Sequence, residues 1–173
     1  MFFSLHQSFA QRFLGDFRTI TEITKVGDVI FFAADDGVNG LELWKSDGSP
    51  SGTVLVKDIN KGIYSSSLSG LTEYKGLLYF SAFENINGQE LWVSDGTADG
   101  TKILKNIRSN SLPRDKGSSP HNFFIFQDEL FFRTTDGNGN SQIWKTDGSE
   151  NNTVNIYGAD FRITNLVVID KYF

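Results

Sequence analysis

One short motif occurs three times along the chain. The copies read ELWKSDGS, ELWVSDGT and QIWKTDGS, and they begin at Glu42, Glu90 and Gln142, at spacings of 48 and 52 residues. The flanking segments repeat as well, since a Phe-rich stretch and a polar turn precede each copy and a further apolar stretch follows it. A fixed period of this length is typical of repeat architectures, in which each unit is one supersecondary structure stacked on its neighbours. The repeat therefore constrains the fold more than any local pattern does.

Each unit contains four short apolar stretches separated by residues that favour turns. The Phe-rich stretches cover 28–34, 76–82 and 128–134, and those after the Trp motif cover 53–59, 101–107 and 153–157. Shorter stretches lead into successive units at 20–26, 68–74, 123–126 and 166–169. Four antiparallel strands at this period are typical of a propeller blade. The sequence predicts an all-β, β-propeller-like array of four-stranded antiparallel blades, with about three blades and the start of a fourth in an incomplete ring.

The predicted organisation is one repeat domain over residues 17–173. Its blades are expected at approximately 20–67, 68–119 and 120–165, with a partial unit at 166–173. Residues 1–16 form an apolar lead-in, in which Ser8 and Ala10 have the spacing that a signal peptidase reads. Two interpretations stay open: the lead-in is the remnant of an export signal, or it packs on the fold.

Composition agrees with strands and excludes several classes of function. The chain has 16 Phe, 5 Tyr and 3 Trp but only 3 Pro, a mixture that favours strands joined by tight turns. The net charge of −5 and scattered basic residues argue against nucleic acid as a partner. There is no apolar run of the length that crosses a bilayer, so no membrane span is expected. The absence of Cys excludes disulfides and thiolate metal sites.

The motif resembles the ELWxxDGT repeat. The segment from Glu42 to Ser49 is followed by Gly52 and Thr53, and the segment from Glu90 to Thr97 is followed by Gly100 and Thr101. The resemblance covers about residues 20 to 170. It implies a large exported bacterial protein with a propeller-like fold, located outside the cell or on its surface, and it implies no particular activity. The third copy departs from the pattern, because Gln142 and Ile143 replace Glu and Leu and Asn152 replaces the glycine.

The repeated residues have architectural interpretations. Trp44, Trp92 and Trp144 are expected to form inter-blade core, the alternative being an aromatic platform for a sugar. An Asp-Gly pair between strands is a strong hairpin signal. In these turns we expect the Asp to accept hydrogen bonds from the next Ser or Thr, and the Gly or Asn five positions later to have a positive φ. The structural motif is therefore Trp44, Asp47, Gly48, Thr53, Trp92, Asp95, Gly96, Thr101, Trp144, Asp147, Gly148 and Thr153.

The polar turns before the Trp strands are weak calcium candidates. Asp136, Asn138 and Asn140 place oxygen atoms at alternate positions, and Asp35 and Asn39 match in part. Neither turn supplies the full twelve-residue pattern, so hairpin turns shaped by Asp, Asn and Gly are the favoured interpretation. No cofactor is predicted, with calcium as the open alternative.

No catalytic constellation is recognisable. His6 and His121 are the two imidazoles, and the nucleophile, zinc and phosphate-loop motifs are missing. The segment 109–121 differs most between units and is a candidate surface loop. We expect a noncatalytic extracellular binding or adhesion scaffold for a protein or glycan ligand, whose open blade edge pairs with further blades or another copy. The alternatives are a fragment of an exported propeller hydrolase acting on glycans and a gene fragment without independent function.

Overall fold

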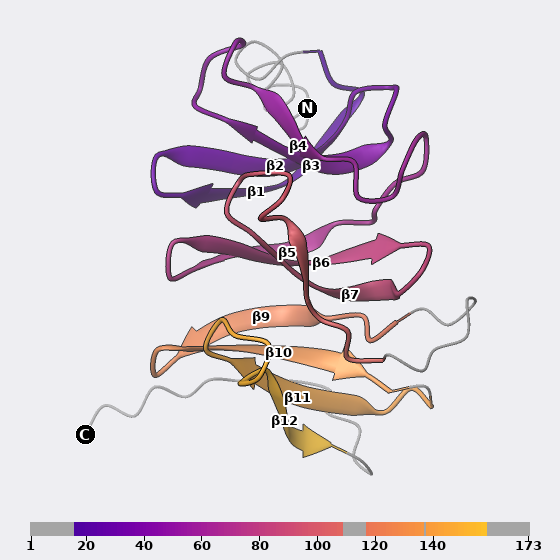
Figure 1. Ribbon diagram of the computed structural model, residues 1–173, viewed down its shortest axis with the longest axis vertical. Coiled ribbons are helices and arrows are strands. Elements are labelled where there is room, and N and C mark those ends of the chain that lie inside the picture. Colours follow the sequence, from indigo (N-terminus) through magenta and orange to yellow (C-terminus); the bar gives the residue numbers. More distant parts are fainter. Residues whose placement is uncertain (1–15, 109–116, 137, 159–173) are drawn as a thin grey trace, which may run out of the picture.

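The computed structural model describes residues 16–108, 117–136 and 138–158, and these residues form three separate four-stranded antiparallel sheets, shown in Figure 1. In each sheet the strand order follows the chain. The first sheet, here called blade 1, contains β1 (Thr19–Val26), β2 (Val29–Asp35), β3 (Leu41–Ser46) and β4 (Val54–Lys57). Blade 2 contains β5 (Ser69–Tyr74), β6 (Leu77–Glu84), β7 (Gly88–Ser94) and β8 (Lys102–Lys105). Blade 3 contains β9 (His121–Phe126), β10 (Glu129–Thr135), β11 (Ser141–Thr146) and β12 (Val154–Gly158).

The predicted fold class is confirmed: the described part of the chain is all-β, with no helix, and its sheets are propeller-like blades. The motif that repeats in the sequence is the third strand of each blade and the turn after it. The expected partial unit at 166–173, the lead-in up to residue 15 and residues 109–116 of the expected insertion lie outside the described residues. No helix among the described residues is long and apolar enough to cross a membrane.

The blades stack face to face, and Figure 1 shows blade 2 between the other two. The first strands of neighbouring blades, β1 with β5 and β5 with β9, contact each other. Because blade 2 has a neighbour on each face, the strand β6 is buried along most of its length. This is why the sequence of β6 lacks the alternation of polar and apolar residues that a half-exposed strand shows.

Two inter-blade cores result from this stacking. The core between blades 1 and 2 is formed by buried residues of both sheets and of the connection between them, among them Phe31, Leu43, Val56, Ile59, Leu71, Leu78, Phe80 and Trp92. The core between blades 2 and 3 contains Tyr74, Tyr79, Leu91, Val93, Leu104, Leu130 and Phe132. Blade 2 therefore contributes one face to each core, whereas blades 1 and 3 contribute to one core each. The stability of a blade thus depends on its neighbours.

The Trp face of each blade points toward the preceding blade. Trp92 is buried and stacks on Phe80, with ring centroids 6.4 Å apart. Trp144 stacks on Phe132 at 6.5 Å and packs against the core between blades 2 and 3. Blade 1 has no preceding blade in the described structure, and there Phe17 contacts Trp44 edge to face at 4.7 Å. The Trp residues thus pack between blades or under Phe17, rather than forming an open platform.

The burial of Phe80 predicts a large loss of stability on truncation. We expect Phe80→Ala to lower the free energy of unfolding by about 3 to 5 kcal/mol, because it removes a fully buried ring and leaves a cavity between two sheets. Urea denaturation measures the change. Tyr64→Ala is the matched control, because it truncates an aromatic side chain that is mostly exposed. An equal effect of the two substitutions would contradict the assignment of Phe80 to the inter-blade core.

Candidate functional site

The Asp-Gly turn after each Trp strand is held by a network of short polar side chains. In blade 2 the Asp95 carboxylate accepts bonds from the Thr97 amide at 2.8 Å and the Thr97 hydroxyl at 2.7 Å. The Ser94 hydroxyl accepts a bond from the Gly96 amide at 3.0 Å and lies 2.7 Å from the Thr101 hydroxyl. Thr101 in turn donates to the carbonyl of Thr97 at 2.6 Å. These bonds close the loop between the third and fourth strands around its own backbone.

The same network is present in all three blades. In blade 1 it joins Ser46, Asp47, Gly48, Ser49 and Thr53. In blade 3 it joins Thr146, Asp147, Gly148, Ser149 and Thr153. The structure therefore shows in every copy the expected bond from the Ser or Thr that follows the Asp-Gly pair. A catalytic group is needed at one place in a protein. Because this turn occurs three times, we interpret it as an architectural element.

The turn carboxylates are poor candidates for acid–base chemistry. The bond from the Thr97 hydroxyl lowers the pKa of Asp95, and the bond from the Ser49 hydroxyl does the same for Asp47. In the third turn the Asn152 amide, followed by the Ser149 hydroxyl, lowers the pKa of Asp147 to about 2. A general base works best with a pKa near the operating pH. These groups remain ionised well below neutrality and serve as hydrogen-bond acceptors.

The fifth position after Asp47 and Asp95 is glycine for a different reason from the one predicted. Neither Gly52 nor Gly100 has a positive φ, so the expectation of a left-handed backbone at this position is wrong. A Cβ atom at either glycine would lie 2.0 Å from the Asp47 or Asp95 carboxylate. The position is thus restricted by close approach of the turn's own carboxylate. In blade 3, Asn152 donates its side-chain amide to Asp147 at 2.6 Å instead.

The Asp-Gly glycines have a positive φ, and they also contact the preceding blade. The φ values are 94° at Gly48, 87° at Gly96 and 104° at Gly148. A Cβ atom at Gly96 would lie 3.0 Å from the Phe31 ring, and one at Gly148 would lie 2.7 Å from the Tyr79 hydroxyl. Each of these two turns therefore packs its glycine against an aromatic ring of the blade before it.

Lysine side chains reinforce this contact from one blade to the next. Lys45 donates to the Gly96 carbonyl at 2.8 Å, and Lys57 donates to the Ala98 carbonyl at 3.0 Å. Lys105 donates to the carbonyl of Glu150, which occupies in the third turn the place of Ala98 in the second, at 3.1 Å. The turn is therefore a docking element: the preceding blade supplies the ring and the ammonium groups, and the following blade supplies the glycine and the carbonyl oxygens.

A buried carboxylate clamps the connection between blades, and sequence analysis missed its role. Glu42 is buried, and it accepts bonds from the amides of Ile59 at 2.8 Å and Asn60 at 3.3 Å. Glu90 accepts bonds from the amides of three residues and from one hydroxyl, at 2.6 to 3.2 Å, contributed by Ile107, Arg108 and Ser118. The available signal was a Glu that recurs on a predominantly buried strand, where an unpaired carboxylate is costly.

The third copy has no such clamp among its described residues. Gln142 stands at this position, and its side-chain oxygen accepts bonds from the Trp144 indole at 3.1 Å and the Thr134 hydroxyl at 3.2 Å. Trp92 donates to the Ala82 carbonyl instead, at 3.1 Å. The divergence seen in the sequence of the third motif is thus accompanied by a different partner for the Trp indole.

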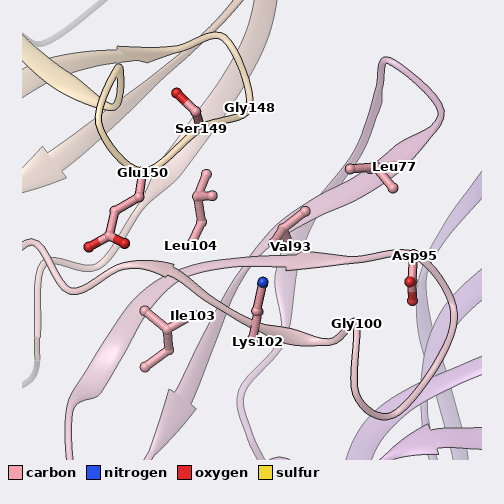
Figure 2. A pocket seen from close by; sticks show the side chains of 10 residues that line it. All are labelled: Leu77, Val93, Asp95, Gly100, Lys102, Ile103, Leu104, Gly148, Ser149 and Glu150. Carbon is pink, nitrogen blue, oxygen red and sulfur yellow. The ribbon is translucent and has the colours of Figure 1, made fainter.

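Two grooves lie where a turn meets the preceding blade. The larger, about 530 Å³, lies between blade 2 and the turn of blade 3, and Figure 2 shows the turn facing the side chains of β7 and β8. It is lined by Leu77, Val93, Asp95, Gly100, Lys102, Ile103, Leu104, Gly148, Ser149 and Glu150. The corresponding groove between blade 1 and the turn of blade 2 measures about 200 Å³ and is lined in part by Lys45. At the position of Lys45, blade 2 carries Val93.

The polar turns considered for calcium use their side chains within the turn. Asp136 accepts bonds from the amides of Asn138 and Asn140 and from the Asn140 side chain. Asp35 accepts a bond from the Gly37 amide, and the Asn39 side chain donates to Asp36. Across the described residues, no group of three or more His, Asp or Glu side chains gathers in an arrangement that could hold a metal ion.

The remaining candidates are described only in part. His6 and residues 109–116 of the variable segment lie outside the described residues. The described end of that segment packs on blade 2, since Gly117 forms a parallel bridge with Gln89 and its carbonyl accepts a bond from Arg108 at 2.9 Å. The Nδ1 atom of His121 lies 2.8 Å from the carbonyl of Ser119. These contacts fix the entry into blade 3.

No protein-family model matches this chain, and no curated protein matches it. A solved structure from work on two prolyl endopeptidases, their catalysis and their specificity is similar, with a TM-score of 0.52 and 16% sequence identity. The similarity covers 78% of this chain and 19% of the other, so this chain spans about a fifth of that protein's length. At this identity the similarity shows the fold alone, and it supports the propeller-like arrangement of the blades.

The turn network predicts that Asp95→Ala destabilises the protein although Asp95 is exposed. The substitution removes both acceptor bonds to Thr97 and loosens a turn that packs on Phe31. We expect the melting temperature to fall by a few degrees, measured by thermal denaturation. Asp99→Ala, in the same turn and also exposed, is the matched control and should leave the melting temperature nearly unchanged. Equal melting temperatures for the two variants would count against the network.

The Glu42 clamp predicts a loss of stability with rising pH. Burial raises the pKa of Glu42 from 4.5 to about 7, so between these values the folded state binds a proton that the unfolded state releases. The contribution is complete below pH 4.5 and is lost as the pH rises through 7. The lowered pKa values of the turn Asp residues act below this window.

From pH 5 to 8 we expect a loss from this group on the order of 2 kcal/mol, measured by urea denaturation at each pH. Burial also raises the pKa of Glu90, which adds to the same trend. Glu42→Gln should therefore flatten the pH profile in part. Glu150→Gln, at an exposed position, should leave the slope unchanged. A Glu42→Gln profile as steep as that of the wild type would refute the assignment.

Proposed function

We propose that this protein is a noncatalytic binding scaffold that takes an extended peptide segment of a protein partner in the groove between blades 2 and 3. The observation that carries the proposal is the difference between the two equivalent grooves. Lys45 reaches across the first groove to the Gly96 carbonyl, whereas Val93 leaves the second one open at about 530 Å³. Of these two grooves, the one between blades 2 and 3 therefore has more room for a ligand.

The lining of the groove suits a peptide. Leu77, Val93, Ile103 and Leu104 provide apolar surface, while Lys102, Asp95 and Glu150 provide one positive and two negative charges. Binding sites of this kind combine a mostly apolar lining with a few polar groups that fix orientation. A peptide with an apolar side chain between charged residues of both signs matches this distribution.

The edge strand beside the groove supports the same partner. β8 is the outermost strand of blade 2, and its residues Lys102, Ile103 and Leu104 line the groove. An extended peptide can add to an exposed sheet edge through main-chain hydrogen bonds and place alternate side chains in adjacent pockets. The groove is then the side-chain pocket and β8 the template.

A glycan ligand is less well supported. Sugar recognition through a Trp platform requires an accessible indole face, and Trp92 is buried while Trp144 packs against the core between blades 2 and 3. None of the three Trp residues lines the larger groove. The extracellular or cell-surface location expected from the ELWxxDGT resemblance belongs to the same proposal, since exported repeat proteins encounter partners there.

A second candidate is a propeller module of a hydrolase whose catalytic groups lie in other parts of a longer protein. The structural similarity to the chain from the prolyl endopeptidase work favours it as far as the fold is concerned. The two candidate functions differ in whether a bound substrate is converted to product. Release of product from a peptide or polysaccharide substrate by the purified chain would support the hydrolase, and binding without product release would support the scaffold.

The groove predicts that Val93→Lys abolishes ligand binding without unfolding the protein. The introduced lysine should reach the Gly148 carbonyl, as Lys45 reaches that of Gly96, and close the groove. Labelled protein is applied to a peptide array and a glycan array. We expect binding to extended peptides with both charges, and a dissociation constant at least tenfold higher for Val93→Lys.

The matched control is Val54→Lys, which makes the same change at an exposed position on β4, away from the groove. It should bind as the wild type does, and circular dichroism should show both variants folded. Binding that survives Val93→Lys, or binding to glycans alone, would contradict the proposal.

A further inference from the structure

The two junctions between described blades, blade 1 with blade 2 and blade 2 with blade 3, share one arrangement. An aromatic residue on the second strand of a blade, Phe31 or Tyr79, packs against the glycine of the following turn, Gly96 or Gly148. Fourth-strand lysines of the same blades donate to carbonyl oxygens of those turns. The junction therefore has two distinct halves: a face with the ring, and a face with the Trp and the glycine turn.

The two open ends of the described stack carry one half each, and they lie at opposite ends in Figure 1. Blade 3 presents Phe131, which pairs with Lys145 as Phe31 pairs with Lys45 and Tyr79 with Val93. Blade 1 presents Gly48, and a Cβ atom there would have no neighbour within 4 Å. Each open end therefore has the half-junction that the other end lacks.

The open face of blade 3 has apolar residues at positions whose equivalents in blades 1 and 2 are buried. Ile156 on β12 occupies the bulge position of Val56 and Leu104. It is 46% exposed, against 5% and 8% for those two residues. Phe126, in the place of the buried Tyr74, is 37% exposed. The face also carries Arg133, at the position of Ala33 and Ser81, and its guanidinium donates to the Ser141 hydroxyl at 2.8 Å. No blade packs against this face among the described residues.

The open face of blade 1 differs from the interior Trp faces. Phe17 covers Phe32 and Trp44. The Trp44 indole nitrogen is buried and has no hydrogen-bond partner among the described residues, whereas Trp92 and Trp144 each have one. Phe17 leaves the Gly48 turn uncovered. The remaining contact on this face is therefore centred on that turn.

From these complementary halves we infer that two copies of this chain associate head to tail, with the Phe131 face of each copy against the Gly48 turn of the other. Two such junctions related by a twofold axis close a ring. The three described blades of each copy give six in such a ring, within the range of about four to eight that propellers use. Closure distinguishes this assembly from an open head-to-tail filament.

Sedimentation velocity over a range of concentrations tests the inference on the full chain. The wild type should sediment as a dimer of 19.3 kDa subunits. Ile156→Asp places a charge on the open face of blade 3, and Gly48→Asn adds a side chain where the partner's ring must approach. Asn tolerates a positive φ better than most residues do, so the fold should survive. Each substitution should weaken dimerisation at least tenfold.

Two matched controls separate docking from folding. Ile86→Asp alters an isoleucine that is 82% exposed in the β6–β7 turn, away from both faces. Gly76→Asn alters a glycine with φ 78° and nothing within 4 Å, in the β5–β6 turn. Both controls should remain dimeric.

Three outcomes would overturn the inference. A wild type that is monomeric at all concentrations shows that the halves do not meet between copies. A series of ever larger polymers shows that the ring does not close. A dimer that Ile156→Asp abolishes but Gly48→Asn preserves shows that two blade 3 faces pair with each other instead.

Discussion

The structure depends on one constraint: a four-stranded blade has two apolar faces and covers neither by itself. Blade 2 satisfies the constraint on both sides. Its Phe80 and Trp92 pack against blade 1, and its Tyr79 and Leu91 against blade 3. Burial of this surface is the main favourable contribution, since each fully buried large side chain adds about 1.5 to 3 kcal/mol. The other features of the described structure serve to bring the faces together in a fixed register.

Polar residues set that register. The Asp-Gly turn offers a glycine and carbonyl oxygens to the ring and lysines of the preceding blade, so its internal hydrogen bonds fix a surface that docks. Glu90 binds both ends of the connection that leaves blade 2, through the amides of Ile107 and Ser118. These groups would attract attention as catalytic carboxylates in another fold. Here the structure shows them as acceptors of hydrogen bonds from the chain itself.

The sequence predicted the architecture well because the repeat supplied three independent copies of each signal. The third strand, the hairpin and the acceptor role of Asp95 follow from spacing and from the local chemistry of Asp, Gly and Thr. The predicted positive φ at Gly100 was wrong. Glycine is required there by the close approach of the Asp95 carboxylate, and the replacement of this glycine by Asn152 in the third copy does not reveal that contact. The Glu90 clamp was missed because its donors lie 17 and more residues away. The open groove depends on Val93 standing in place of Lys45, a difference that has meaning only once both grooves are seen.

Native-state hydrogen exchange of backbone amides tests the central claim most directly. If stacking on both faces stabilises a blade, the slowest-exchanging amides must lie in β6 and β7, because blade 2 is the one described sheet with a neighbour on each side. The measurement is made on Ile156→Asp, which keeps two copies apart. There the paired amides of β2, β3, β10 and β11 should exchange faster, since in a single copy their sheets each have a described neighbour on one side only. Equal protection in the three blades, or greatest protection in blade 1 or blade 3, would contradict the account.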